Sequence, residues 1–160
     1  MNEITNEDII KMLKDGTMYN IMFNKYQNQP TEKNYVAILR TLCEMEELWY
    51  IAKNIKFGDP NFASDIPKGA IMVLKDNHMP NVLIAPDGKK AYAIYTSMDC
   101  IHAIRKSEDS AIAVSILTMK KILANMQADK VNHIIVNYGF NNELVLDDSA
   151  VEAIKHFLEQ

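Results

Sequence analysis

Cysteine is scarce in this chain, which contains only Cys43 and Cys100. The two residues lie far apart, and neither belongs to a CxxC pair or to a cluster of cysteine and histidine. A zinc knuckle is therefore excluded, and a chain of this length needs no disulfide staple. The sequence predicts two reduced, partly buried thiols in a cytosolic protein.

Long hydrophobic runs, glycine and proline are also few. The longest apolar stretches fall far short of the roughly 20 residues that a membrane span requires. Residues 1–8 are polar and acidic, unlike a secretory signal. Five glycines and five prolines are too few for a collagen-like or linker-like chain. We therefore expect a soluble cytoplasmic protein that does not enter a membrane.

A large excess of charge of one sign is absent as well. Lysine and arginine total 17 against 21 aspartate and glutamate residues, and the net charge of −4 is spread evenly over the two halves of the chain. A dedicated nucleic-acid binder carries a basic stripe, and none is visible. The charge balance therefore argues against nucleic acid and against an anionic membrane, and it leaves proteins or small molecules as partners.

The chain does have enough apolar material for one core, since 48% of its 160 residues are hydrophobic. Apolar side chains recur at helical spacing through the first 45 residues. Thr5 or Asn6 can cap the first helix, Gly16 ends it, and Thr31 can cap a later helix. The pattern then becomes short and β-branched, which predicts strands. The predicted strands are residues 48–52, 71–74, 82–85, 91–95, 111–117, 132–137 and 144–146, with a long loop over residues 53–68.

The second half of the chain alternates strands with helices, an order that favours parallel strands joined by crossovers. Asp87-Gly88 between two apolar runs predicts a hairpin, because glycine accepts the positive φ of the turn. Further helices are predicted to begin at Thr96 or Ser97, at Thr118, and at Asp147 or Asp148. We therefore predict an α/β (mixed α+β) fold, in which a single domain over residues 1–160 has one mixed parallel and antiparallel sheet covered by helices. Residues 1–29 form its helical N-terminal extension.

No catalytic motif is present in the sequence. The four histidines lack the i, i+3 or i, i+4 spacing of a helical metal site, and there is no phosphate-binding glycine loop and no G-x-S-x-G elbow. Cys100 and His102 are two residues apart, a spacing that places them on different faces of a helix. The acidic pairs are expected to cap helices or to face water; they are Glu46-Glu47, Glu108-Asp109 and Asp147-Asp148. We expect no enzyme, no metal and no other cofactor.

Two features indicate binding instead of catalysis. Thr96, Ser97, Asn137 and Gly139 lie at the ends of predicted strands, where α/β sheets tend to bind ligands and where helix starts offer N–H groups to an anion. Side-chain capping is the alternative explanation for the hydroxyl groups. The second feature is Trp49 together with ten methionines, since an exposed aromatic face or a Met-rich surface forms protein contacts. Most methionines fall on predicted apolar faces, where they fill a core.

Three segments resemble the SseB family, named after enhanced serine sensitivity, and specifically its N-terminal domain. A helix over residues 31–44 runs into the sequence LWYI, like the family's helix and following strand. Asp87-Gly88 followed by residues 93–99 (AIYTSMD) resembles its hairpin, strand and capped helix, and residues 129–139 (DKVNHIIVNYG) resemble its later strand and turn. Tyr95 stands where the family has Phe, Tyr138 where it has Pro, and His133 where it has a small residue.

The resemblance covers roughly residues 30–158 and implies a bacterial, cytoplasmic domain. It carries over no active site, because none is established for the family. Our leading hypothesis is therefore a non-enzymatic protein-interaction domain whose partner is unidentified. The alternative is a small-molecule or anion sensor that binds near the strand ends, and the third hypothesis is an enzyme whose residues meet only in the fold. The candidate ligand- or partner-binding residues are Trp49, Tyr95, Thr96, Ser97, Asn137 and Gly139.

Overall fold

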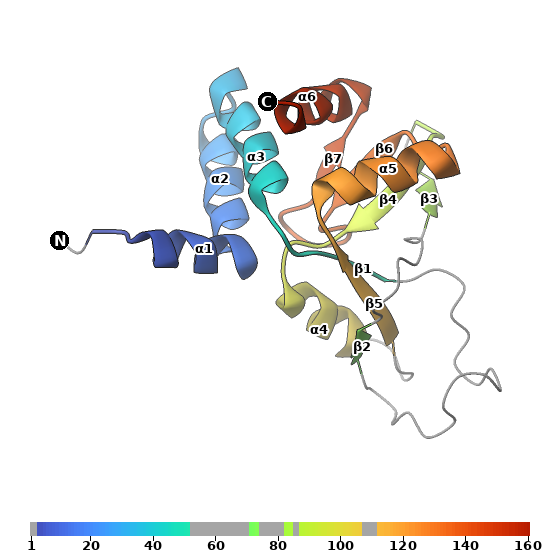
Figure 1. Cartoon of the computed structure of the whole chain (residues 1–160), viewed down its shortest axis with the longest axis horizontal. Coiled ribbons are helices and arrows are strands. Elements are labelled where there is room, and N and C mark those ends of the chain that lie inside the picture. Colours follow the sequence, from blue (N-terminus) through green and yellow to red (C-terminus); the bar gives the residue numbers. More distant parts are fainter. Residues whose placement is uncertain (1–2, 52–70, 74–81, 85–86, 107–111) are drawn as a thin grey trace.

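The computed structural model describes residues 3–51, 71–73, 82–84, 87–106 and 112–160 (Figure 1). Its helices are α1 (Asn6–Lys14), α2 (Thr17–Asn28), α3 (Glu32–Glu44), α4 (Met98–Lys106), α5 (Met119–Asp129) and α6 (Asp148–Leu158). Its strands are β1 (Leu48–Ile51), β2 (Ile71–Val73), β3 (Val82–Ile84), β4 (Lys90–Ile94), β5 (Ile112–Leu117), β6 (His133–Val136) and β7 (Leu144–Leu146). The predicted loop over residues 53–68 lies outside the described residues.

The strands form two sheets, with the orders β1-β5-β2 and β3-β4-β6-β7. Strand β5 is antiparallel to β1 and parallel to β2, whereas β4 is antiparallel to β3 and parallel to β6, which is antiparallel to β7. The predicted mixed α/β fold is confirmed. The structure differs from the prediction in having two sheets instead of one, because β5 pairs with β1 and β2 and not with β4 or β6. Two backbone hydrogen bonds between Trp49 and Tyr95, of 2.8 and 2.7 Å, join β1 to the end of β4.

The helix starts follow the predicted caps. Thr5, Thr31, Thr118 and Asp147 each accept, through the side chain, a hydrogen bond from the backbone N–H three residues further on. Each cap satisfies one of the N–H groups that a helix start leaves without an intrahelical partner. The predicted hairpin joins β3 to β4, and Gly88 in its turn has a φ of +84°. Local sequence signals therefore define most element boundaries.

The main core lies between one face of the four-stranded sheet and the helices α2, α3, α5 and α6 (Figure 1). Helix α2 contributes Tyr19 and Phe23, so this part of the N-terminal segment belongs to the core, whereas α1 contains no buried residue. Met119 and Met126 are buried, as their helical spacing predicted. Among the described residues, no helix has the length and apolar character needed to cross a membrane.

A smaller core lies under helix α4, where the two sheets meet. Its buried apolar members include Trp49 from β1, Tyr95 after β4, Ile101 from α4 and Val114 from β5. Helix α4 begins directly after the strand β4 and covers the carboxyl end of that strand. The predicted strand-end residues therefore lie where this smaller core, the helix and both sheets come together.

Candidate functional site

The ends of β4 and β6 lie side by side, because these strands are parallel neighbours and Ile94 pairs with Val136. Just beyond them, the Thr96 N–H donates to Asn137 Oδ1 at 2.9 Å, and Asn137 Nδ2 donates to Thr96 Oγ1 at 3.0 Å. The Asn137 backbone has a φ of +54°, a conformation that asparagine tolerates better than most residues. Two residues that the sequence placed at separate strand ends therefore form one hydrogen-bonded pair.

This strand-end pair is closed to solvent. Thr96 is 1% exposed and Asn137 is 0% exposed. Ser97 Oγ accepts a hydrogen bond from the Cys100 N–H at 3.4 Å and so caps α4, and Cys100 Sγ lies 3.7 Å from Asn137 Oδ1. The hydroxyl and amide groups of this cluster bond to one another. The hydroxyl groups of Ser97 and Thr118 therefore cap helices, which was the alternative to ligand binding. Thr96 instead joins the ends of β4 and β6 through its hydrogen bonds to Asn137.

The environment of Cys100 disfavours the ionised form of its thiol. Burial raises its pKa, although the hydrogen bond from Ser97 acts in the opposite direction. A raised pKa leaves less thiolate at neutral pH, and the thiolate is the reactive form. Cys100 is buried, whereas His102 is exposed, as expected for side chains on different faces of α4.

Trp49 is also buried, at 8% exposed, so its ring does not present the exposed face on which the idea of a protein contact site there depended. The physical reason is its backbone pairing with Tyr95, which holds the indole in the smaller core beside Ile101 and Val114. The indole Nε1 is buried and has no hydrogen-bond partner among the described residues.

An aromatic groove of about 380 Å³ lies on one side of the strand ends. This aromatic groove is lined by Tyr95, Ala103, Ile104, Tyr138, Gly139 and Phe140. Tyr138 is 48% exposed, and the rings of Tyr95 and Phe140 meet edge to face with centroids 6.1 Å apart. Two of the predicted site residues, Tyr95 and Gly139, line this groove, although Tyr95 is itself buried, at 5% exposed.

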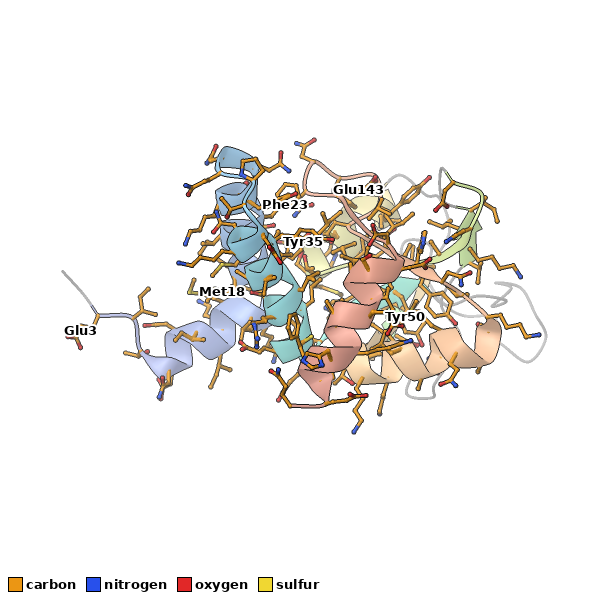
Figure 2. The ribbon with its side chains drawn as sticks, turned by 90° about the horizontal axis from the view of Figure 1, so that it is seen from above. Glu3, Met18, Phe23, Tyr35, Tyr50 and Glu143 are labelled. Atoms are coloured by element: carbon orange, nitrogen blue, oxygen red, sulfur yellow. The ribbon has the colours of Figure 1, made fainter. Side chains whose placement is uncertain are left out.

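The turn that carries Tyr138 and Phe140 is held in place by hydrogen bonds. The Gly139 N–H donates to Glu143 Oε2 at 2.7 Å, and the Phe140 N–H donates to the Asn137 carbonyl at 3.0 Å. The Tyr19 hydroxyl donates to the Asn142 carbonyl at 2.8 Å, which ties the turn to α2. Figure 2 labels Glu143 in this turn. The groove is therefore built on a rigid support.

Sequence reasoning missed Tyr138, Phe140 and Ile104. A signal for the first two was present, because Tyr138 and Phe140 are aromatic residues on both sides of Gly139 in an otherwise polar turn. The contribution of Ile104 was not visible, because it depends on how α4 is oriented over the turn.

A second pocket, of about 310 Å³, lies at the start of α4. It is lined by Lys11, Lys14, Asp15, Glu47, Trp49, Ser97, Met98 and Asp99. Lys14 Nζ lies 3.8 Å from Glu47 Oε1, so part of this charge is paired within the protein. A pocket that combines ammonium and carboxylate groups suits a small polar molecule with both charges better than a simple anion.

His133 forms a separate cluster at the opposite end of β6. The side chain is 3% exposed, with Nδ1 3.5 Å from Asp87 Oδ2 and Nε2 3.2 Å from Asp148 Oδ1. Neither contact has the geometry of a hydrogen bond. Lys89 Nζ donates to Asp148 Oδ2 at 2.7 Å, which lowers the pKa of Asp148. These contacts tie the β3–β4 hairpin to the start of α6, which is a structural role.

The acidic pairs that the structure describes do not form an acid–base site with Cys100. Asp147 caps α6 and Asp148 faces Lys89, at the far end of β6 from Cys100. Glu47 lies near Lys14, and the pair at residues 108–109 is outside the described residues. A third pocket, of about 600 Å³, lies between α5 and α6 and contains none of the predicted site residues.

Within the described parts of the chain, no three side chains of histidine, cysteine, aspartate or glutamate are placed to hold a metal ion. No protein-family model matches the sequence, and no curated protein matches it.

Proposed function

We propose that this chain is a non-enzymatic, cytoplasmic protein-interaction domain, and that the aromatic groove binds a partner segment that presents an apolar side chain. The observation that carries the proposal is the groove itself, in which half-exposed Tyr138 stands beside the Tyr95 and Phe140 rings. None of the six lining residues is charged. Tyrosine-rich apolar depressions of this kind supply much of the binding energy in protein interfaces.

The expected affinity is modest. Burying one leucine or phenylalanine side chain contributes roughly 1.5–3 kcal/mol, and flanking backbone contacts add to it. The hydrogen bonds from Gly139 and Phe140 fix the turn before binding, so little ordering of the groove opposes association. One side chain falls short of the roughly 8 kcal/mol of a micromolar complex, so we expect a dissociation constant between about 1 μM and 1 mM, depending on the flanking contacts.

The same proposal includes a relationship to the SseB family. The motifs at residues 31–51, 87–99 and 129–139 support that relationship, and the two free cysteines suit a reducing compartment. The catalytic alternative has no support from Cys100, because burial raises the pKa of its thiol.

Selection of peptides from a random displayed library tests the proposal. Bound peptides should share one large apolar residue, and titration of the ¹⁵N-labelled protein should shift the amide signals of Tyr138, Gly139 and Phe140. Peptides that shift only signals far from this turn, or a library that yields no binder, would contradict the proposal.

A small-molecule sensor is the second candidate function, and one observation favours it. The buried Trp49 Nε1 lacks a hydrogen-bond partner among the described residues, and Trp49 also lines the mixed-charge pocket at the start of α4. A thermal-shift screen with amino acids, serine included, tests this candidate. A rise in the melting temperature that is lost in Lys11→Ala would support it, and no rise with any compound would remove it.

A further inference from the structure

Helix α1 lies at the edge of the molecule: Lys11 and Lys14 line the pocket at the start of α4, and most of the helix is exposed. In both views its first turns project from the side of α2, away from the sheets (Figure 1, Figure 2), and Figure 2 labels Glu3, just before the helix, at this outer end. It contains no buried residue, and its attachment to the core includes the partly buried Leu13. Ile10, in the middle of the helix, is 64% exposed. One side of α1 therefore has no partner in the protein as described.

The exposed apolar side chains of the molecule concentrate here. Seven large apolar residues are exposed among the described residues, and four of them lie on α1, just before it or on the adjacent α2. These four are Ile4, Ile9, Ile10 and Ile21. Such a concentration at one protruding end indicates a surface that is covered in a complex.

The sequence nevertheless specifies α1 strongly. Thr5 and Asp8 form a capping box, with hydrogen bonds of 2.9 Å from the Thr5 N–H and 3.1 Å from the Asp8 N–H. At the other end, the Asp15 side chain accepts a hydrogen bond from the Thr17 N–H at 2.9 Å. A helix of nine residues is marginal in water unless its apolar face is packed. Both observations indicate that the free side of α1 packs against a partner.

The charged residues of α1 indicate which kind of partner can pack against its exposed side. Its first turn holds Glu7 and Asp8, and its last turn holds Lys11 and Lys14. Glu7 lies three residues before Ile10 and Lys14 lies four residues after it, so the three side chains share a face. With a rise of 1.5 Å per residue, the midpoint between Glu7 and Lys14 falls about 1 Å from Ile10 along the axis.

A second copy of the same helix in antiparallel orientation complements this face. It places Ile10 against Ile10 of the other copy and brings each Glu7 beside the other copy's Lys14. The Lys14 side chain is 68% exposed, and within its own chain it lies 3.8 Å from Glu47. Antiparallel helix dipoles also attract each other at their ends. A surface that is complementary to itself in this way is the requirement for a two-fold symmetric interface.

We propose that α1 is the interface between two copies of this chain, which pair antiparallel about a two-fold axis next to Ile10. Two nine-residue helices cover less than the roughly 1,600 Å² of a standard interface, so we expect a weak dimer that dissociates between about 1 μM and 1 mM. A lipid surface is a poorer fit, because α1 lacks the excess of lysine and arginine that anionic membranes attract.

Charge reversal in sedimentation equilibrium experiments tests the proposal. Wild type should dimerise with rising concentration, whereas Glu7→Lys and Lys14→Glu should each weaken the dimer at least tenfold, because each variant places like charges opposite one another. An equimolar mixture of the two variants should restore dimers that contain one chain of each, since both contacts are then attractive. Ile84→Ser, at an exposed residue on β3, is the matched control and should dimerise like wild type.

The mixture also separates a lost interface from a lost fold, because misfolded variants would not restore one another. Circular dichroism of each variant should match that of wild type. A wild type that stays monomeric up to millimolar concentration, a dimer that survives both single reversals, or a mixture that stays monomeric would each overturn the proposal. Binding of wild type to anionic vesicles without any dimer would overturn it in favour of a membrane surface.

Discussion

Among the glycines that the structure describes, Gly16 is the one with the closest neighbours. It joins α1 to α2 with a φ of +84°, and a Cβ atom there would lie 2.9 Å from the Thr96 carbonyl oxygen and 3.0 Å from Ser97 Cβ. The bend between the two helices therefore packs directly on the strand end. Gly88, in the β3–β4 turn, has the same φ, but a Cβ atom there would meet nothing within 4 Å.

These two glycines form a matched pair for a stability measurement. Gly88→Ala incurs only the cost of a left-handed conformation, and we expect the free energy of unfolding to fall by roughly 1–2 kcal/mol. Gly16→Ala adds a backbone clash, so we expect a loss of roughly 2–4 kcal/mol. Urea denaturation of both variants gives the comparison. Equal losses would mean that the close approach to Thr96 has no energetic consequence.

The cysteines provide a second test at this scale. Burial raises the pKa of the Cys43 thiol to about 11 and also raises the pKa of Cys100. Both thiols should therefore react more slowly at neutral pH than free cysteine with an aromatic disulfide reagent. Cys43→Ser isolates Cys100, and unfolding in urea should abolish the protection. If folded Cys100 reacts faster than free cysteine, the result would contradict this prediction and support a catalytic thiol.

Asp148 gives a prediction for pH. The Lys89 ammonium holds the pKa of this carboxyl below 3.8, so its contribution to stability is present above that pH and is lost as the pH falls through the lower folded-state pKa. Asp148→Asn should therefore make the unfolding free energy less dependent on pH below about 4. Acid titrations followed by circular dichroism measure this, with the exposed Glu159→Gln as control. An unchanged acid profile in Asp148→Asn would show that the Lys89 contact adds no stability.

At the scale of elements, the strand-end pair fastens β4 to β6. Asn137→Ala removes the buried acceptor of the Thr96 N–H and the donor to its hydroxyl, and it places alanine at a φ of +54°. We expect a loss of roughly 2–4 kcal/mol in the free energy of unfolding. Asn142→Ala, which loses an exposed hydrogen bond to Asn20, should cost roughly 0.5 kcal/mol. A small loss in Asn137→Ala would mean that the β4–β6 contacts alone hold the strand ends together.

Local signals predicted most elements, because caps and turns depend on residues close in sequence. Thr31 caps α3 and Gly88 forms the hairpin turn as the sequence indicates. The partner of β5 was not predictable in this way. Strand β5 pairs with β1, so that Ile116 lies opposite Trp49, a residue far away in the chain. Hydrophobic periodicity does not encode which strand pairs with which.

At the scale of the whole molecule, the candidate site was predicted in part. Thr96 and Asn137 meet because parallel strands place their carboxyl ends together, and this follows from the order of elements. The burial of that pair and of Trp49 was not predictable, because it depends on α4 and on the junction of the two sheets. The same junction leaves the neighbouring aromatic groove open.

The most direct test of the proposed function is the affinity of a library-selected peptide for two variants of this protein. Tyr138→Ser removes a half-exposed ring from the aromatic groove without disturbing a buried residue. Ile84→Ser changes an exposed apolar residue outside the groove. Calorimetry should give at least tenfold weaker binding to Tyr138→Ser and wild-type binding to Ile84→Ser. Equal affinity of the peptide for wild type and Tyr138→Ser would contradict the assignment of the groove as the binding surface.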